Sequence, residues 1–237
     1  MRDQKTLTII IPAYNEEPTL AAVVAKVARL AERYASDYEI IVVDDASTDR
    51  TGAILDDCAA KNPHIHPIHN PKNMNFGWNF QKGLELARMH YVSFIPGDDD
   101  ISEDSLERMI GAIGRADFVL LYHSNYEARH WLRRIVSKLF VCIVNLLFGL
   151  TVRYYNGPAM FRTDILRAVP ITTFSFAFVA EIVVRLIKRG HSYIEVPMVL
   201  RPERKGLNLR VFRPRNTWGV VKTILRLWWR IQIQHKI

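Results

Sequence analysis

The first half of the chain alternates short apolar runs with longer segments of helical periodicity. Apolar runs of strand length, several of them rich in β-branched residues, occur at Leu7–Ile11, Tyr38–Val43, Ile65–Ile68, Tyr91–Phe94 and Phe118–Tyr122. Between them the pattern predicts helices at Pro18–Tyr34, Thr51–Lys61, Trp78–His90 and Glu103–Arg115. This alternation predicts an α/β fold, with a mostly parallel sheet covered by helices on both faces.

Polar clusters follow three of the predicted strands. They are Tyr14-Asn15-Glu16, Asp44-Asp45-Ala46-Ser47 and Asp98-Asp99-Asp100. Because parallel strands end at the same edge of a sheet, we expect the clusters to converge on one ligand. Their side chains suit a base, a ribose and a metal-bound diphosphate, so a nucleotide site is predicted. The sequence has neither the glycine fingerprint of dinucleotide-binding folds nor the lysine motif of P-loop enzymes.

The aspartate triplet carries the candidate metal chemistry. Asp98 and Asp100 form an Asp-x-Asp pair at a strand end and can ligate Mg²⁺ or Mn²⁺, which takes its other ligands from water and substrate phosphates. For this triplet alone, the simpler alternative is a solvated acidic turn that caps the helix starting near Ser102. The two other polar clusters favour the metal-diphosphate interpretation.

Two later segments are amphipathic and basic. His130–Leu150 is predicted to form an amphipathic helix pair, and Thr217–Gln234 a further helix. In the second segment, a narrow basic stripe lies beside a wide apolar face that contains tryptophans; the stripe consists of Lys222, Arg226 and Arg230. Tryptophans and cations beside an apolar face suit a helix that lies in a membrane interface. The alternative is packing of both apolar faces on the sheet, which we expect for much of their area.

The charge distribution narrows the choice of partner. The net charge is +8, and the chain from Arg201 onward contains ten Lys or Arg residues and a single acidic residue, Glu203. Such a segment should meet phospholipid head groups or nucleic acid. Nucleic acid is disfavoured, because the aromatic residues fall on the apolar side of a helix and acidic strand ends repel phosphate when no metal is bound. Membrane contact is therefore the preferred interpretation.

Several features bear on localisation. The sequence contains no uninterrupted apolar run of about 18 residues, so we expect no transmembrane helix. The N-terminus leads directly into a predicted strand, without signal-peptide features. Cys58 and Cys142 lack metal-ligand spacing and fit a reducing compartment. These features predict a peripheral protein at the cytoplasmic face of a membrane.

The motifs Ile11–Glu16, Val42–Thr51 and Asp98–Asp100 resemble those of family two inverting glycosyltransferases with the GT-A fold. Later motifs resemble the polyprenyl-phosphate glycosyltransferases and dolichyl-phosphate mannose synthase in order and approximate spacing; they are Trp131–Lys138, Asn156–Arg162, Phe178–Glu181 and Glu195–Pro197. The resemblance implies a GT-A domain over residues 1–210, with a nucleotide-sugar half at 1–122 and an acceptor half at 123–210. A basic amphipathic helix at 211–237 would follow.

The resemblance also implies roles on the donor side. Residues expected to contact the nucleotide-sugar and its diphosphate are Pro12, Tyr14, Glu16, Asp45, Asp98 and Asp99. Asp98 and Asp100 would bind Mg²⁺ or Mn²⁺, and Ser102 would be a weaker ligand at a position where relatives often have Gln.

On the acceptor side, Arg133 matches a family arginine that meets the acceptor phosphate. The family's phosphate-contacting lysine is absent from Gly206–Leu209, and Lys205 or Arg210 would replace it. The family has membrane-bound members with transmembrane helices that this chain lacks, so a membrane-protein partner is a further expectation.

The implied reaction is inverting transfer of a single sugar from a UDP- or GDP-sugar to a dolichyl or undecaprenyl phosphate. A phosphate acceptor is already anionic at neutral pH and needs no strong general base. The alternative is a hydroxyl acceptor on a glycan or a lipid-linked sugar, for which Glu181 or Asp104 would act as the base. Glu181 lies on an apolar helix and is expected to be structural or to orient its neighbours, with a direct catalytic role as the alternative.

Overall fold

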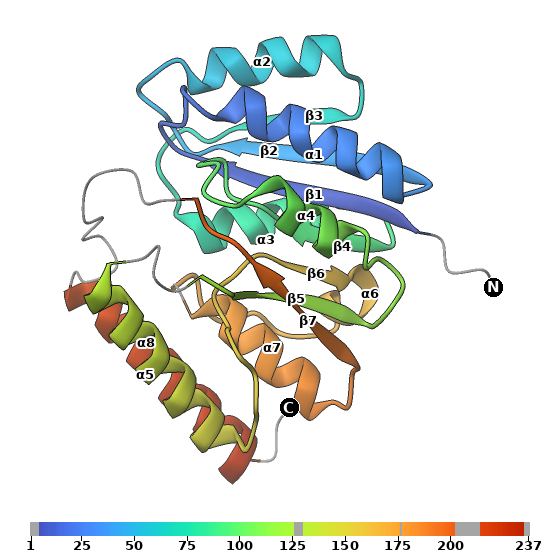
Figure 1. The fold of residues 1–237 in the computed structure, drawn as a ribbon. Helices are drawn as coiled ribbons and strands as arrows, with labels where there is room; N and C mark the ends of the chain where they lie inside the picture. Colours follow the sequence, from blue (N-terminus) through green and yellow to red (C-terminus); the bar gives the residue numbers. More distant parts are fainter. Residues whose placement is uncertain (1–4, 126–129, 176, 202–213, 235–237) are drawn as a thin grey trace.

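A computed structural model describes residues 5–125, 130–175, 177–201 and 214–234 of the protein. One seven-stranded sheet runs through the molecule in the order β3-β2-β1-β4-β6-β5-β7 (Figure 1). The strands are β1 (Thr6–Ala13), β2 (Asp37–Asp44), β3 (Ile65–His69), β4 (Tyr91–Phe94), β5 (Phe118–His123), β6 (Ala159–Arg162) and β7 (Tyr193–Met198). The pairs β1–β2, β1–β4, β2–β3 and β5–β7 are parallel, as the alternating pattern predicts.

Strand β6 is antiparallel to both of its neighbours, β4 and β5. Two antiparallel steps restore the direction of the parallel strands, so β4 and β5 end at the same edge of the sheet. The strand ends that carry the three polar clusters, those of β1, β2 and β4, lie side by side at this edge. We refer to it as the carboxyl edge.

Helices cover both faces of the sheet (Figure 1). They are α1 (Leu20–Tyr34), α2 (Thr51–Lys61), α3 (Phe76–Leu86), α4 (Glu103–Ile110), α5 (Trp131–Phe148), α6 (Thr163–Arg167), α7 (Phe178–Lys188) and α8 (Pro214–Trp228). On β1, Ile9 and Ile11 pack into a core with α1, α2 and α4, whereas Ile10 packs into a second core with α3 and α7. Alternation along a strand explains the split, because successive side chains point to opposite faces.

Two helices end earlier in the structure than their sequence pattern predicts. The helix expected to reach His90 ends at Leu86, and the one expected to reach Arg115 ends at Ile110. After Ile110 the chain turns, and Gly114 takes a positive φ of 81°, a conformation that glycine adopts without steric cost.

The segment predicted to form a helix pair is instead one helix. The described chain is helical from Trp131 to Phe148, and Gly149 ends α5 in the left-handed conformation with a φ of 61°. No glycine or proline interrupts the segment before Gly149, which explains why it continues without a turn.

Helix α8 runs beside α5 in the same direction, and both begin near the carboxyl edge (Figure 1). It continues into a π-helix, η3 (Trp229–Ile233), in which the amide of Gln234 donates to the carbonyl of Trp229 across 3.1 Å. The second amphipathic segment is therefore helical over its described part. The predicted domain boundary at residue 210 lies outside the described residues.

Candidate active site

The loop that follows β4 holds the aspartate triplet at the carboxyl edge; we call residues 96–102 the metal loop. The amide of Gly97 donates to the carbonyl of Pro12 across 3.3 Å, which joins the metal loop to the end of β1. On its other side, the amide of Ser102 donates to the carbonyl of Val199 across 3.1 Å. The metal loop is thus held between the end of β1 and the segment after β7.

Asp98 and Asp100 lie close enough to interact electrostatically. The amide of Asp100 donates to Asp98 Oδ1 across 3.3 Å. Burial and then the nearby charge of Asp100 raise the pKa of Asp98 to about 6. The raised pKa means that ionising Asp98 beside Asp100 is unfavourable. A cation between the two carboxylates would stabilise their ionised forms.

The donor chemistry fits a divalent cation. Carboxylate oxygens are the ligands that Mg²⁺ and Mn²⁺ prefer. Across the described residues no group of three His, Cys, Asp or Glu side chains is arranged to hold a metal ion. A cation at Asp98 and Asp100 would therefore take its remaining ligands from water and from the diphosphate of a substrate.

Asp99 and Ser102 both contact other side chains of the protein. Asp99 has a positive φ of 57°, and its carboxylate forms ion pairs with Lys26 and Arg201. Ser102 Oγ lies 2.7 Å from Ser105 Oγ at the start of α4. Both carboxylate oxygens of Asp99 are engaged in these ion pairs, and its contact with the nucleotide-sugar remains a prediction. A metal contact of Ser102 remains a prediction.

The end of β1 and the start of α2 form the nucleotide side of the edge. Pro12 is buried, and Tyr14 and Glu16 are half-buried just beyond it. The amide of Glu16 donates to Thr51 Oγ1 across 2.8 Å, and Thr19 Oγ1 donates to Glu16 Oε2 across 3.2 Å. The amide of Asn15 donates to Ser47 Oγ across 3.0 Å, so the structure brings the first two polar clusters together, while contact with a nucleotide remains a prediction.

Asp45 organises the asparagine-rich loop at residues 70–75. Its Oδ1 accepts hydrogen bonds from Asn70 Nδ2 across 2.8 Å and from the amide of Met74 across 2.7 Å. Its Oδ2 accepts from the amide of Asn75 across 3.1 Å. Asp45 is 3% exposed, so the carboxylate acts here as the fixed centre of a loop. The sequence motif predicts Asp45 in the site but not this network, because the partners of Asp45 lie 25 to 30 residues away in the chain.

On the acceptor side, Arg133 is half-buried in the first turn of α5, near the carboxyl edge. Glu181 is 1% exposed in α7. Its carboxylate accepts from the amide of Thr172 across 3.0 Å, from Thr172 Oγ1 across 2.7 Å and from Arg185 Nη2 across 3.1 Å. These contacts support the expectation that Glu181 is structural or orients its neighbours. Lys205 and Arg210 lie outside the described residues.

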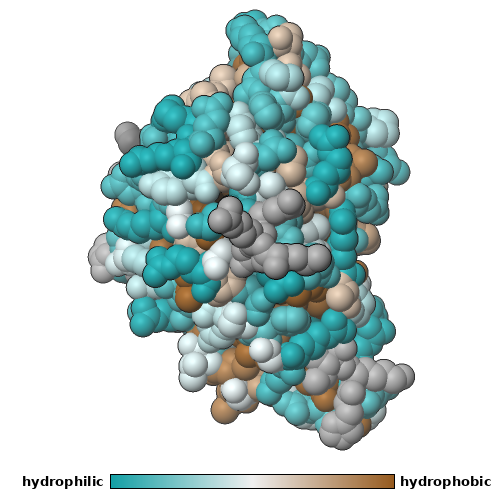
Figure 2. Space-filling model, turned by 90° about the vertical axis from the view of Figure 1, so that its right-hand side faces the viewer, coloured by the Kyte–Doolittle hydropathy of each residue, from teal (hydrophilic) through white to brown (hydrophobic). Residues whose placement is uncertain are grey.

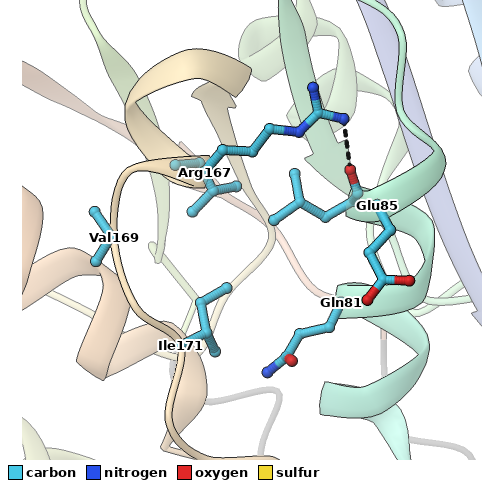
Figure 3. A pocket seen from close by; sticks show the side chains of 7 residues that line it. Gln81, Glu85, Arg167, Val169 and Ile171 are labelled. Carbon is cyan, nitrogen blue, oxygen red and sulfur yellow. Dashed lines mark hydrogen bonds between the residues drawn. The ribbon is translucent and has the colours of Figure 1, made fainter.

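A separate cavity of about 230 Å³ contains none of the predicted site residues (Figure 3). It is lined by Gln81, Leu84, Glu85, Leu166, Arg167, Val169 and Ile171. The guanidinium of Arg167 donates to the carbonyls of Leu84 and Ala87 across 2.9 and 2.6 Å and thereby caps the end of α3. Arg167 accordingly has a structural role in this cavity.

Comparisons with known proteins agree with this geometry. Residues 8–170 match the model of glycosyl transferase family 2. Polyprenol monophosphomannose synthase of Mycolicibacterium smegmatis is 27% identical over 218 residues, which cover 86% of this chain and 80% of that protein. Undecaprenyl-phosphate mannosyltransferase of Micrococcus luteus is 26% identical over 211 residues, covering 83% of this chain and 84% of the relative. Two other curated relatives are longer, and the matched regions cover 29% and 38% of their length.

Among solved structures, glucosyl-3-phosphoglycerate synthase of Mycobacterium tuberculosis matches with a TM-score of 0.72 at 16% identity, over 94% of this chain and 80% of that one. Its complex with Mn²⁺, UDP and phosphoglyceric acid matches with a TM-score of 0.68 over 94% of this chain and 78% of the other. This likeness shows the GT-A fold. The family match over residues 8–170 shows in addition that the chain belongs to glycosyl transferase family 2 and is a glycosyltransferase.

Proposed function

We propose that the protein transfers one sugar, with inversion, from a UDP- or GDP-sugar to a polyprenyl phosphate at a membrane surface. The observation that carries this proposal is the position of two exposed apolar helix faces. Helices α5 and α8 begin near the carboxyl edge, where the metal loop and the nucleotide side meet (Figure 1).

The donor chemistry requires charge stabilisation at the diphosphate. In an in-line displacement at the anomeric carbon, the nucleoside diphosphate leaves with increased negative charge. A divalent cation held by Asp98 and Asp100 would act there as a Lewis acid and template, and the complex of the related synthase contains Mn²⁺ with UDP. Arg133 would add fixed positive charge at the acceptor phosphate.

The apolar exposure of the described protein is concentrated on α5, α8 and η3, which carry eleven of the fourteen exposed large apolar side chains. On α5 these are Trp131, Ile135, Val136, Leu139, Ile143 and Leu146. On α8 and η3 they are Trp218, Val221, Leu225, Trp229 and Ile233. Their spacing of three to four residues forms a stripe along each helix. Viewed from the side opposite the carboxyl edge, the surface is mainly hydrophilic, with small, separate apolar areas (Figure 2).

The energetics suit reversible membrane contact. A half-exposed apolar side chain gains roughly 1 kcal/mol on entering a membrane interface. Eleven of them give on the order of 10 kcal/mol, which is similar to the cost of immobilising the protein. The exposed cations Lys222 and Arg226 on α8 can each add about 1 kcal/mol on anionic lipids. No described helix has the length and apolarity needed to cross a bilayer.

The acceptor chemistry also favours a phosphate. A hydroxyl acceptor requires a general base, and Glu181, one of its two candidates, is buried and bonded to Thr172 and Arg185. The other candidate, Asp104, is exposed in the first turn of α4. A phosphate acceptor makes a base unnecessary. Both curated relatives described above have names that specify a polyprenyl carrier.

Turnover of nucleotide-sugars with polyprenyl phosphate and Mn²⁺ tests the proposal. We would follow release of the nucleoside diphosphate from UDP- and GDP-sugars, with Asp100→Ala alongside and Asp57→Asn, an exposed change on α2, as the control. The expected result is release that requires both the metal and the lipid phosphate and is lost in Asp100→Ala only. Release that occurs only with hydroxyl acceptors would contradict the proposed acceptor.

A further inference from the structure

Three cations on one face of α1 pair with three carboxylates that run from the metal loop into α4. Lys26 contacts Asp99, Arg29 Nη2 lies 2.6 Å from Glu103 Oε1, and Arg33 Nη1 lies 2.7 Å from Glu107 Oε1. The intervals of three and four residues place the cations on one face of α1, and Glu103 and Glu107 share one face of α4, whereas Asp99 lies in the metal loop before that helix. We call this arrangement the α1–α4 ladder.

The three rungs of the ladder differ in burial. We call the two exposed pairs the outer rungs; in them the side chains of Arg29 and Arg33 are 61% and 68% exposed. Such pairs contribute little stability, because water screens them. In the inner rung, the side chains of Lys26 and Asp99 are only 7% and 11% exposed. Loss of Asp99 there leaves the buried ammonium of Lys26 without this counterion, and loss of Lys26 leaves the buried carboxylate of Asp99 with Arg201 alone.

The inner rung fixes the conformation of the metal loop. Asp99 has a left-handed backbone, with a φ of 57°, and sits between the two proposed metal ligands. One of its carboxylate oxygens pairs with Lys26 and the other with Arg201. The amide of Arg201 also donates to the carbonyl of Asp100 across 2.8 Å. Helix α1 and the segment after β7 thus hold the same short loop.

We propose that Lys26 is a positioning residue for the metal site, acting through Asp99. Its ion pair holds the middle carboxylate against α1 and neutralises it, so that Asp98 and Asp100 alone face the cation. This inference rests on the proposed function, because it assumes that the metal loop binds a divalent cation. The inference adds Lys26 to the residues of the metal site, although Lys26 lies 73 positions away from Asp99 in the sequence.

Whether metal affinity rises or falls when Lys26 is made neutral distinguishes a positioning role from simple charge repulsion. An ammonium near a cation site repels the cation, so electrostatics alone predicts tighter metal binding when Lys26 is neutral. Positioning predicts the opposite. Partners that orient metal ligands typically change metal affinity by about 10- to 100-fold when they are removed. A metal affinity is therefore a more informative readout than activity.

The experiment measures Mn²⁺ binding by electron paramagnetic resonance on the full chain, with UDP and with GDP in excess. The variants are Lys26→Met, Lys26→Arg and Arg29→Met, the last being a matched control on the neighbouring, exposed rung. We expect Lys26→Met to weaken Mn²⁺ binding about tenfold or more, Lys26→Arg to retain most of it, and Arg29→Met to stay within about twofold of the unchanged protein.

Thermal unfolding of each variant separates positioning from loss of the fold. If Lys26→Met does not fold, Lys26→Gln supplies the test, because its neutral side chain gives the same opposed expectations, and it should weaken Mn²⁺ binding by a similar factor. Mn²⁺ binding by folded Lys26→Met that equals or exceeds that of the unchanged protein would overturn this inference alone. Absence of Mn²⁺ binding by the unchanged protein would overturn both this inference and the metal-dependent function.

Discussion

The side-chain amide of Gln232 donates a hydrogen bond to the backbone carbonyl of Leu147 across 3.2 Å. Both residues lie near the carboxyl ends of their helical segments, so the contact fixes the parallel arrangement of α5 and the segment formed by α8 and η3. The same arrangement places the first turns of both helices near the carboxyl edge (Figure 1).

The exposed faces of this helix pair give a prediction about lipid binding. The double variant Leu139→Gln with Leu225→Gln removes two side chains that are 57% and 55% exposed. We expect flotation with anionic vesicles to decrease several-fold while the melting temperature stays within a few degrees, because neither side chain is in the core. Leu86→Gln on α3, where the leucine is 47% exposed, is the control. Unchanged flotation of the double variant would argue against the helix pair as the lipid contact.

The raised pKa of Asp98 predicts how stability depends on pH without metal. Asp98 titrates at about 6 in the fold, above the value of about 3.9 in an unfolded chain. Between these values the native state holds a proton that the unfolded state has released, so stability decreases as pH rises through this window. Asp98→Asn removes the ionisation, so this variant should gain melting temperature over the unchanged protein at pH 7.5 and lose that gain near pH 4.

Metal binding should reverse the pH trend. A bound cation needs the deprotonated carboxylate, so Mn²⁺ with UDP or GDP should stabilise the unchanged protein above pH 6 and much less at pH 5. The Asp98→Asn variant, which carries a neutral amide in place of the carboxylate, should show little stabilisation at either pH. Calorimetry with and without Mn²⁺ measures both effects, and equal stabilisation at pH 5 and pH 7.5 would exclude Asp98 as the titrating ligand.

Glu181→Gln tests whether this carboxylate is structural. The change leaves Arg185, whose side chain is 3% exposed, without its counterion in the core. We expect a loss of about 3 kcal/mol in the free energy of unfolding, measured with urea, and partial recovery in Glu181→Gln with Arg185→Met. If the single variant keeps its stability but loses turnover, Glu181 acts directly in the reaction.

Asp45→Asn should loosen the loop at residues 70–75. The substitution removes the charge and one of the two carboxylate oxygens that accept from the amides of Met74 and Asn75. Hydrogen exchange in a peptide covering this loop should become about tenfold faster or more, and nucleotide affinity should decrease with it. Asp57→Asn is the control, since that side chain is exposed on α2. Unchanged exchange would show that other contacts hold the loop.

The sequence allowed prediction of the elements that local patterns determine. The runs at Tyr91–Phe94 and Thr51–Lys61 have the bounds that the structure shows, and the edge where three polar clusters meet follows from parallel strand order. The local pattern does not predict strand β6, because its four residues lie in a motif without distinct periodicity. Its pairing with β4 joins residues far apart in the chain.

The contacts of the metal loop could not be predicted for the same reason. Lys26 has the appearance of an ordinary cation on an amphipathic helix, and its partner Asp99 lies 73 residues away. A signal was present in the spacing of Lys26, Arg29 and Arg33 against that of Asp99, Glu103 and Glu107. Recognising it requires knowledge that α1 and α4 are neighbours, which only the fold supplies.

The π-helix after Trp228 determines in which direction the side chains of the last turn point around the helix axis. Along an α-helix, residues four apart drift by about 40° around the axis, so a stripe spaced by fours gradually leaves its face. The wider turn over Trp229–Ile233 advances less per residue and offsets this drift. Ile233 consequently stays aligned with Trp229 and Leu225. Deleting one residue within η3 would therefore turn the end of the helix away from its apolar stripe while hardly changing its length.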